Sequence, residues 1–401
     1  MNMVDINEQK IEEILTRGVE EVIDKDHLRK KLLSGNVLRV KLGIDPTSSN
    51  LHIGRSIPLL KLKDFQDLGH RVVLIIGDFT GTIGDTSDKD SERPMLDPKT
   101  IKENMKTYIK QAGKILNIRK CEVVYNSKWL GKLGYGEIGR QADQFSLHEM
   151  IMRENIKTRI DAGKRVSFRE LLYPLMQGYD SVAIKADVEL GGTDQRFNLL
   201  AGRELQRYYG QEPQDIVTNP LIEGLDGRKM SSSWGNTINL LDNANEMFGK
   251  VMSLKDEFIE KYFILATRVP IVEIEKIKKM TNPRDQKARL AKEIVKMYHG
   301  EGEAQKAEEE FNKVFRDKEM PSEMETFETN KKAYPVLDLL SDTGLAESRG
   351  EAKRLVEGGG VHIEVNGRVS DTENWRDEIN IEDEMVVRVG KRKFVKIHLI
   401  K

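Results

Sequence analysis

The most constraining feature of the sequence is a strand–helix–strand pattern between residues 38 and 76. Aliphatic residues alternate along 38–44, which predicts a strand with one buried face. Apolar side chains then recur every three residues along 59–68, a helical spacing that ends at Gly69. The next run, 72–76, is entirely apolar, as is typical of a central parallel strand. Together these pieces predict a parallel sheet with helices packed against it.

The segment LHIGR, residues 51–55, lies where this helix begins. The first amide N–H groups of a helix lack internal partners, and the peptide dipoles add partial positive charge there. Beyond the carboxyl end of a parallel strand, such a terminus is suited to a phosphate. Gly54 permits close approach to the backbone, and His52 and Arg55 can donate hydrogen bonds to anionic oxygens. The alternative is an ordinary helix capped by Asn50, with His52 and Arg55 on its solvated face.

Length and composition restrict the class of protein. A chain of 401 residues predicts two or three domains. Its 65 basic and 66 acidic residues argue against a protein coated in basic charge, although a local basic surface remains possible. The single cysteine, Cys121, excludes a disulfide framework and a multi-cysteine zinc site. The N-terminus resembles no targeting signal and no apolar run is long enough for a bilayer, so we expect a cytoplasmic protein without membrane attachment.

Strand and helix signals divide the chain into regions. Their alternation predicts a doubly wound, Rossmann-like α/β domain with a parallel sheet over residues 1–239. Within it, about 128–180 is mostly helical and is interpreted as an insertion. Residues 240–316 have a purely helical pattern, and 317–333 are polar and are predicted to be a strand-free linker. The last region, 334–401, is predicted to be a separate, small α+β domain.

A second distinctive stretch is GRKMSSSWGN, residues 227–236. Two glycines and three serines around Lys229 disfavour a helix and predict a mobile loop. A lysine on such a loop can reach a polyphosphate as a compact charge. A solvated surface turn is the alternative interpretation.

Polar residues between these two stretches suggest a small polar ligand. Tyr173, Gln177 and Asp180 share one face of a helix that begins with the capping box Ser167…Glu170. The alternative is a solvent-facing side of that helix. Two glycine-containing loops add further polar groups, with Asp78 and Asp85 in IGDFTGTIGD and Asp194 and Gln195 in LGGTDQRFN.

The two stretches together resemble the signatures of class I aminoacyl-tRNA synthetases. The HIGH-like motif is His52-Ile53-Gly54-Arg55, and the KMSKS-like motif is Lys229-Met230-Ser231-Ser232-Ser233. With KLGIDPTSSNLHIG, LLYPLMQGYDS and LGGTDQRFNLL, the chain resembles tyrosyl-tRNA synthetases over essentially its whole length. No GxxxxGK[ST] motif occurs, which argues against a P-loop phosphotransferase.

The resemblance implies an enzyme of translation that activates L-tyrosine with ATP and Mg²⁺ and then transfers the tyrosyl group to the 3′ end of tRNA(Tyr). It implies catalytic roles for His52, Arg55, Lys229 and Ser232. It implies ATP binding by Thr47, His52, Gly54, Asp194, Lys229 and Ser232. It implies tyrosine binding by Asp85, Tyr173, Gln177, Asp180 and Gln195, with Asp180 accepting a hydrogen bond from the phenol. No protein ligands for a metal are singled out.

Three positions depart from the family pattern. Arg55 replaces the second histidine of HIGH, and Ser232 replaces the second lysine of KMSKS. Arg55 can offset a lost donor, because a guanidinium is permanently charged and offers several N–H groups. Lys41 stands where many bacterial members carry a tyrosine that helps to bind the phenol, so phenol recognition is expected to depend more on Asp180.

The C-terminal region resembles an S-four-like RNA-binding domain. A helix after the capping box Ser348…Glu351 carries basic residues, and a basic segment follows near the end of the chain. The candidate RNA-binding residues are Arg349, Lys353, Arg354, Lys391, Arg392 and Lys393. By resemblance, the helical region lies on the anticodon side and the insertion forms a homodimer. A small domain with solvated charges is the alternative.

Two other functions compete with this interpretation. Tryptophanyl-tRNA synthetases share the fold and both signatures but usually lack the terminal RNA-binding domain. A non-catalytic paralogue that only binds RNA is suggested by Arg55 and Ser232, although Lys229 and Asp194 keep suitable chemistry.

Overall fold

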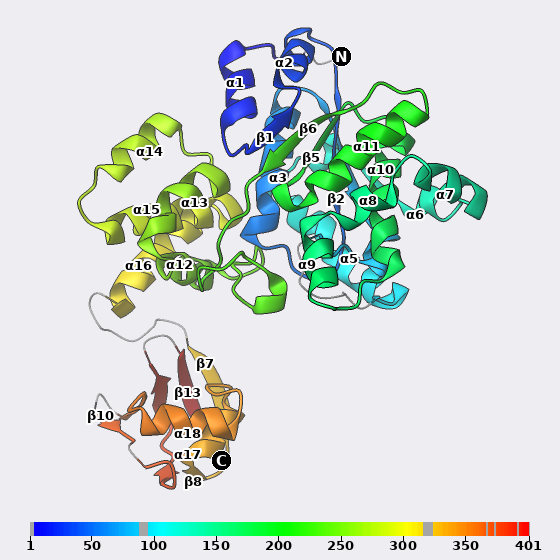
Figure 1. Cartoon of the computed structure of the whole chain (residues 1–401). Coiled ribbons are helices and arrows are strands. Elements are labelled where there is room, and N and C mark those ends of the chain that lie inside the picture. The colour runs from blue at the N-terminus through cyan, green and yellow to red at the C-terminus, as the bar shows by residue number, and fades with distance from the viewer. Residues whose placement is uncertain are drawn as a thin grey trace. The chain divides into compact units, whose positions relative to one another are not determined.

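The computed structural model describes residues 4–87, 95–315, 324–365, 368–372, 374–390 and 393–400. The chain forms two compact units, Met1–Gln305 and Lys306–Lys401 (Figure 1). Among the described residues, no helix has the length and apolar character needed to cross a membrane.

A six-stranded sheet with the order β1-β6-β5-β2-β3-β4 forms the centre of the first unit. Its strands are β1 (Glu21–Ile23), β2 (Arg39–Ile44), β3 (Arg71–Ile76), β4 (Cys121–Tyr125), β5 (Val188–Gly192) and β6 (Asp215–Asn219). Strands β2 to β6 pair in parallel, and β1 is an antiparallel edge strand beside β6. The predicted doubly wound parallel sheet is confirmed, and its strand order reverses between β2 and β5.

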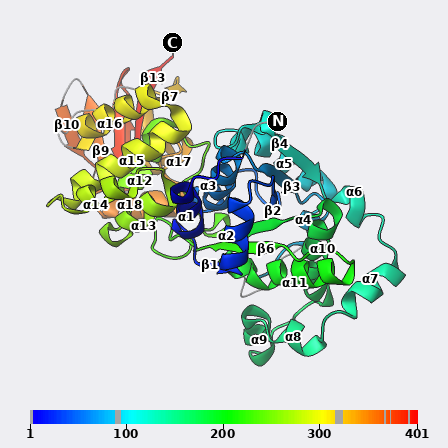
Figure 2. The ribbon, with the colours of Figure 1, turned by 90° about the horizontal axis from the view of Figure 1, so that it is seen from above.

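Helices cover both faces of this sheet. Helices α3 (Ile53–Asp67) and α5 (Pro98–Ala112) lie on one face, and α10 (Phe168–Ile184) and α11 (Arg196–Tyr208) lie on the other (Figure 2). The apolar run in β3 is buried because both faces of the central strands are covered. The predicted strand–helix–strand unit is therefore confirmed as β2–α3–β3.

Short helices surround this central part. At the N-terminus lie α1 (Glu8–Thr16) and α2 (Lys25–Leu33), and α4 (Thr80–Ile83) follows β3. Between β4 and α10 come α6 (Ser127–Leu130), α7 (Tyr135–Ala142), α8 (Leu147–Ile151) and α9 (Glu154–Asp161), of which α7 to α9 project from the sheet (Figure 2). Helix α10 begins as its capping box predicts, because Glu170 accepts a hydrogen bond from the Ser167 N–H at 2.9 Å.

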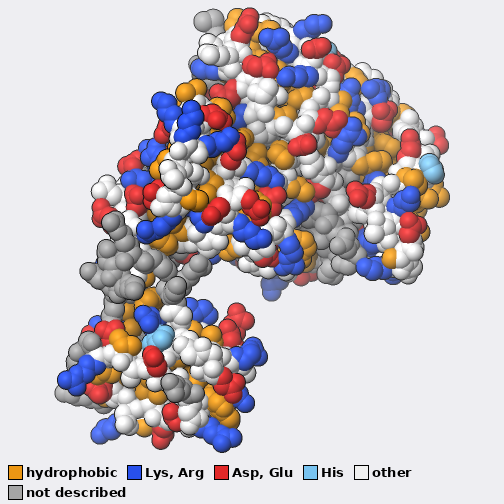
Figure 3. All heavy atoms as spheres, turned by 60° about the vertical axis from the view of Figure 1, so that its left-hand side comes forward, with side chains coloured by type: hydrophobic (Ala, Val, Ile, Leu, Met, Phe, Trp, Pro, Cys, Tyr) orange, Lys and Arg blue, Asp and Glu red, His pale blue; other side chains and the backbone are white. Residues whose placement is uncertain are grey.

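The predicted helical region contains α12 (Ala244–Met252), α13 (Ile259–Ala266), α14 (Ile271–Lys278), α15 (Pro283–His299) and α16 (Glu301–Phe315). Helix α15 starts at its cap Asn282, whose side chain accepts from the Arg284 N–H, and ends before Gly300 at a φ of 90°. Helix α13 packs against α3. Positive and negative side chains mix over this region (Figure 3), as in the pairs Lys278–Glu260 and Arg289–Glu273.

The second unit is a small α+β domain. Its five-stranded sheet has the order β10-β9-β12-β13-β7, and β11 pairs with β8. The strands are β7 (Glu325–Thr329), β8 (Ala333–Pro335), β9 (Val361–Val365), β10 (Arg368–Asp371), β11 (Glu378–Asn380), β12 (Val386–Val389) and β13 (Lys393–Leu399). Helices α17 (Val336–Asp342) and α18 (Arg349–Glu357) pack on one core with the strands.

Strand β7 corrects one prediction, because it forms within residues 317–333, which the sequence predicted to be strand-free. It pairs in parallel with β13, and its one large apolar residue, Phe327, packs against the core of the domain. One aromatic residue in a polar segment does not produce the alternation of apolar and polar residues by which a strand is predicted from sequence. The partner strand supplies the hydrogen bonds that make this segment a strand.

Candidate active site

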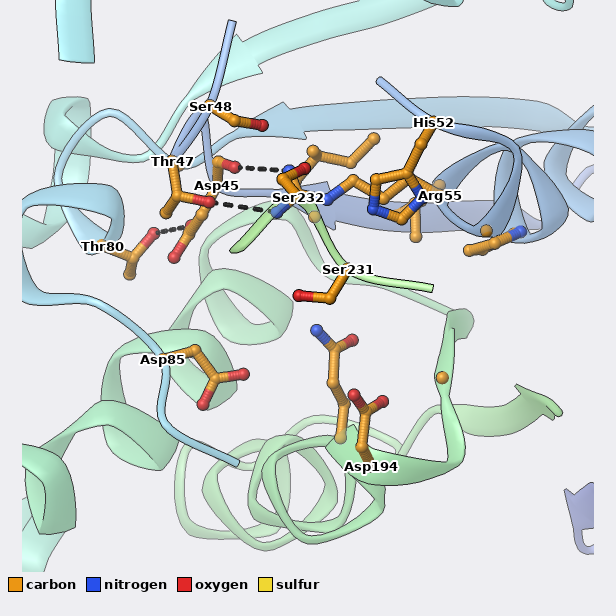
Figure 4. Close-up of a pocket in the computed structure, with 18 of the residues that line it drawn as sticks. Asp45, Thr47, Ser48, His52, Arg55, Thr80, Asp85, Asp194, Ser231 and Ser232 are labelled. Carbon is orange, nitrogen blue, oxygen red and sulfur yellow. Dashed lines mark hydrogen bonds between the residues drawn. The ribbon is translucent and has the colours of Figure 1, made fainter. Parts of the chain in front are cut away.

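A cavity of about 420 Å³ lies at the carboxyl ends of β2 and β5, where the strand order reverses (Figure 4). Crevices at such points are the usual ligand sites of open α/β sheets. All candidate catalytic, ATP-binding and tyrosine-binding residues line this cavity: Thr47, His52, Gly54, Arg55, Asp85, Tyr173, Gln177, Asp180, Asp194, Gln195, Lys229 and Ser232. Asp78 does not, because its carboxylate accepts from the Ser127 N–H at 2.9 Å and from its hydroxyl at 2.6 Å.

The N-terminus of α3 forms one wall. His52, not Asn50, is the residue that precedes the helix, and its side chain is buried. The Ile53 N–H donates to the Ile238 carbonyl at 2.9 Å, and the Gly54 N–H points at Met230 Sδ at 3.3 Å. The two signature motifs are therefore in direct contact, and the interpretation of an ordinary solvated helix start is wrong.

Arg55 is held in place beside this terminus. Its guanidinium donates to the Asp45 main-chain carbonyl at 3.1 Å and to Thr47 Oγ1 at 3.0 Å (Figure 4). It also donates to the Tyr108 hydroxyl at 3.1 Å. These contacts fix a permanent positive charge at the cavity wall, in the first turn of α3.

Asp45 is a functional candidate that the sequence analysis missed. Its carboxylate accepts from Thr80 Oγ1 at 2.7 Å and from the Tyr173 hydroxyl at 2.8 Å. A Cβ on Gly77 would lie only 2.0 Å from Asp45 Oδ1, so glycine leaves the space that this carboxylate occupies. Its position directly after β2, at the ligand-binding edge of the sheet, was the available signal.

Tyr173 is locked as a donor by this arrangement. Burial raises the pKa of the Tyr173 phenol well above its usual range, and the negative charges of Asp45 and Asp85 act in the same direction. The hydroxyl therefore stays protonated and keeps its hydrogen bond to Asp45.

Asp180 lies at the buried end of the cavity. Its Oδ1 accepts from Trp129 Nε1 at 2.7 Å, and its Oδ2 accepts from Asn126 Nδ2 at 3.3 Å. Burial raises the pKa of Asp180 to about 7, while the positive charge of Lys41 and these two hydrogen bonds oppose the rise. A carboxylate in this setting can accept a hydrogen bond from a hydroxyl group. Sequence reasoning missed Trp129 and Asn126, which come from the segment after β4.

Two other predicted tyrosine-binding residues are also held by neighbours. The Gln177 carboxamide donates to Glu189 Oε1 and accepts from Asn198 Nδ2, both at 3.1 Å. The Asp85 carboxylate accepts from the Ser87 N–H at 2.9 Å and from its hydroxyl at 2.6 Å. Gln195 Oε1 lies where a Cβ on Gly191 would approach to 3.0 Å, so that glycine leaves room for its side chain.

The loop that carries Lys229 lines the cavity beside the N-terminus of α3. Lys229 Nζ lies 2.8 Å from Asp194 Oδ2. Asn236, a buried residue that the sequence analysis missed, fastens the loop by accepting from the Ser231 N–H at 2.8 Å and donating to the Lys229 carbonyl at 3.1 Å. This loop lines the cavity, although Ser232 and Ser233 are exposed.

All six candidate RNA-binding residues belong to the second unit. Two of them, Lys391 and Arg392, fall outside the described residues. Arg349 pairs with Asp338 at 2.8 Å, and Lys353 Nζ lies 4.4 Å from the centre of the Trp375 ring. Lys393 Nζ donates to the Leu345 carbonyl at 3.1 Å.

Family models match both units. Residues 33–316 match tRNA synthetases class I (W and Y), and residues 313–397 match the tyrosine–tRNA ligase SYY-like C-terminal domain. The fold, the two motifs in contact and the first match define a class I aminoacyl-tRNA synthetase of the tryptophan and tyrosine group.

Curated relatives narrow this class. A tyrosine–tRNA ligase of Thermotoga maritima is 47% identical over 390 residues, which cover 96% of this chain and 96% of that protein. A tyrosine–tRNA ligase of Moorella thermoacetica is 44% identical over 395 residues, covering 96% and 95%. The chain belongs to the tyrosine–tRNA ligase family. The predicted function is thereby confirmed. The relatives favour a tyrosine–tRNA ligase over the alternative of a tryptophanyl-tRNA synthetase.

Solved structures share the fold. A C-terminally truncated Aspergillus nidulans mitochondrial tyrosyl-tRNA synthetase has a TM-score of 0.65 at 23% identity, covering 76% of this chain and 94% of that chain. The Archaeoglobus fulgidus tyrosyl-tRNA synthetase complexed with L-tyrosine has a TM-score of 0.60 at 23% identity, covering 76% and 100%.

Proposed function

We propose that the cavity between β2 and β5 binds L-tyrosine at its Asp180 end and ATP at the N-terminus of α3. The observation that carries this proposal is the gathering of buried hydrogen-bond acceptors at one end and of cationic or N–H donors at the other. Asp180 would accept from the phenol hydroxyl. Asp85, Tyr173 and Gln177 would surround the ammonium group, and Gln195 would lie near the carboxylate.

The nucleotide would lie against the two signature motifs. Thr47, His52 and Gly54 would contact phosphates and adenine at the helix terminus, where anions are favoured. Asp194 would hold the ribose, so its ion pair with Lys229 must part when ATP enters. Lys229, Arg55 and Ser232 would then face the pyrophosphate, with the guanidinium offsetting the missing second lysine.

The reaction needs no covalent protein intermediate. The tyrosine carboxylate attacks the α-phosphorus of ATP, the bond to pyrophosphate breaks, and tyrosyl-adenylate stays bound. A terminal hydroxyl of tRNA(Tyr) then attacks the tyrosyl carbonyl carbon, and AMP leaves. The chain contributes positioning and charge stabilisation, which are the main terms for such transfers.

We propose that Mg²⁺ enters with ATP and is not held by a dedicated protein site. Around the phosphate end the cavity offers cations and N–H donors, which suit oxygens of a metal-bound pyrophosphate. Among the described residues, the one group of metal-ligating side chains is Asp383, Glu384 and His398, which belongs to the second unit. Bound Mg²⁺ would neutralise charge on the leaving pyrophosphate.

Amino-acid-dependent ATP–pyrophosphate exchange tests these roles. Tyrosine, phenylalanine and tryptophan are compared for the native chain and for Lys229→Ala. We expect kcat/KM for exchange to be far higher with tyrosine than with phenylalanine or tryptophan, and we expect exchange to collapse in the variant. Absence of exchange with all three, while tRNA still binds, would instead support the non-catalytic RNA-binding paralogue suggested by Arg55 and Ser232.

We propose that the second unit binds tRNA phosphates through Arg349, Lys353, Arg354, Lys391, Arg392 and Lys393, with residues 240–316 on the anticodon side. Helix α18 presents three of these cations, and Lys353 and Arg376 both lie against Trp375, at 4.4 and 4.7 Å. Replacing the three α18 cations by alanine should weaken tRNA binding and lower its salt dependence, with pyrophosphate exchange unchanged.

We propose that the insertion forms a homodimer and that the enzyme works in the cytoplasm, where its tRNA is charged. Tyr135, Leu147, Met152 and Phe168 are exposed large apolar residues in this insertion. Leu147→Glu combined with Phe168→Glu should shift the sedimentation of the enzyme to the monomer. Val272→Glu, at an exposed apolar residue on α14, is the matched control and should leave the dimer intact.

A further inference from the structure

A buried ion pair crosses the sheet beneath the cavity. Lys41 on β2 and Glu189 on β5 are register partners in the parallel ladder. Lys41 Nζ lies 3.0 Å from Glu189 Oε1, and each side chain is only 1% exposed. Removing both charges from water costs free energy unless further hydrogen bonds satisfy them. We therefore asked which groups this pair is bonded to.

The hydrogen bonds of this pair lead to α10 at Gln177. Glu189 Oε1 also accepts from Gln177 Nε2 at 3.1 Å, and Lys41 Nζ donates to the Gln177 main-chain carbonyl at 3.2 Å. Because Gln177 Oε1 accepts from Asn198 Nδ2, both ends of its carboxamide are occupied. The pair therefore fixes the position and the orientation of a residue that lines the cavity.

The other oxygen of Glu189 is satisfied within the interior. Glu189 Oε2 accepts from Ser181 Oγ at 3.1 Å and also from Gln214 Nε2. With Lys41 and Gln177 on Oε1, four donors form a hydrogen-bonded network around the carboxylate. Such a network holds its members rigidly.

The ammonium group of Lys41 also acts on Asp180. Lys41 does not line the cavity, so it can influence a ligand only through residues that do, namely Gln177 and Asp180. Its positive charge favours the ionised form of Asp180, while Glu189 acts in the opposite direction more weakly. Trp129 and Asn126 both donate to Asp180, and these hydrogen bonds also favour the ionised carboxylate, which can only accept hydrogen bonds.

We propose that Lys41 and Glu189 are positioning residues that set the preference for tyrosine over phenylalanine, by orienting Gln177 and by holding Asp180 as an acceptor for the phenol hydroxyl. The inference rests on the proposed placement of tyrosine in this cavity. Neither residue touches the substrate, and the pair acts through Gln177 and Asp180.

The test is the double variant Lys41→Met with Glu189→Gln, which removes both charges at similar volume and leaves no unpaired ion. Pyrophosphate exchange is measured with tyrosine and with phenylalanine, and thermal unfolding checks the fold. We expect the tyrosine-to-phenylalanine ratio of kcat/KM to fall at least about tenfold, with KM for ATP within about twofold. An unchanged ratio in a folded variant would reduce the pair to a structural role and overturn the proposal.

Glu189→Gln alone is the second variant, and thermal unfolding checks its fold because it leaves the buried Lys41 ammonium beside a neutral amide. It replaces the charge-assisted hydrogen bond to Gln177 by a neutral one, so KM for tyrosine should rise at least about threefold while kcat stays within about twofold. An unchanged KM contradicts the proposal. Lys61→Met is the matched control, because Lys61 is also a buried lysine but its Nζ donates to the Ile14 carbonyl away from the cavity. It should leave the ratio unchanged.

Asp180→Asn separates this inference from the proposed site. If Asp180→Asn also leaves the ratio unchanged, the placement of the phenol is wrong. If Asp180→Asn lowers the ratio and the double variant does not, the placement stands and the role of Lys41 and Glu189 is rejected.

Discussion

The two ends of the cavity are built in different ways. At the proposed amino-acid end, Asp180, Gln177 and Tyr173 project from one long helix, and each is hydrogen-bonded to a neighbouring side chain. At the proposed nucleotide end, the main charges come from a loop residue, Lys229, and from Arg55 at a helix terminus. A rigid end suits recognition of a small side chain, whereas a loop-borne cation can follow charge as it develops on a leaving group.

The largest effect should come from the loop-borne cation. Lys229→Ala should lower kcat of pyrophosphate exchange about 10²–10³-fold, the usual cost of one lost transition-state donor. KM for tyrosine should stay nearly constant, because the rigid end is untouched. Steady-state exchange kinetics check both values, and a variant that loses tyrosine affinity instead would show that the two ends are not separate.

A change at the rigid end should alter selectivity more than rate. Asp180→Asn keeps the shape but removes the charged acceptor, so kcat/KM for tyrosine should fall about 10- to 100-fold while that for phenylalanine changes little. Parallel exchange assays with both amino acids measure the ratio. If kcat/KM fell equally for tyrosine and phenylalanine, the substitution would have damaged the pocket as a whole and would not have removed a specific contact with the hydroxyl.

The pH dependence should also distinguish the two ends. Because burial raises the pKa of Asp180 to about 7, the carboxylate is ionised above that pH and becomes protonated below it. One pH unit below the pKa, about a tenth of the acceptor remains, so KM for tyrosine should rise up to about tenfold between pH 8 and pH 6. Tyr173 stays protonated throughout, because its pKa is raised.

The charged groups that act on Asp180 are Lys41 from β2 and Glu189 from β5. Phenylalanine is the control for this profile, since it lacks the hydroxyl that Asp180 would bind. A matching rise in KM for phenylalanine would assign the titration to another group.

The smallest effect is expected from the fastening of the loop. Asn236→Ala removes the hydrogen bonds to the Ser231 N–H and the Lys229 carbonyl. In a looser loop Lys229 would face the pyrophosphate for a smaller fraction of the time. We therefore expect kcat to fall about fivefold, which corresponds to an activation barrier higher by about 1 kcal/mol. Exchange kinetics with thermal unfolding measure it, and an unchanged kcat in the folded variant would contradict a role for Asn236 in holding the loop.

Much of the site was predictable because its residues stand next to local structural signals. His52 and Gly54 mark a helix start after a strand, and Tyr173, Gln177 and Asp180 follow the helical repeat after a capping box. Their gathering in one cavity follows from a parallel sheet, whose strands all end at the same edge.

Other site features carry no local signal. Asp45 becomes significant only because Thr80 and Tyr173 donate to it, and Trp129 only because its indole reaches Asp180. Asp78 looks equivalent to Asp85 in the sequence, yet it caps α6 and lies outside the cavity lining. Strand β7 likewise depends on pairing with β13.

The sequence by itself determined the doubly wound class, the β2–α3–β3 unit and the two motifs at the ligand-binding edge. Hydrophobic period and helix-end chemistry act over a few residues, and they can therefore be seen in a single chain. Only the tertiary structure decided that Lys41 and Glu189 form a buried pair, because two strands far apart in the sequence had to be paired in register first. The electrostatic surroundings of Asp180 depend on that pairing.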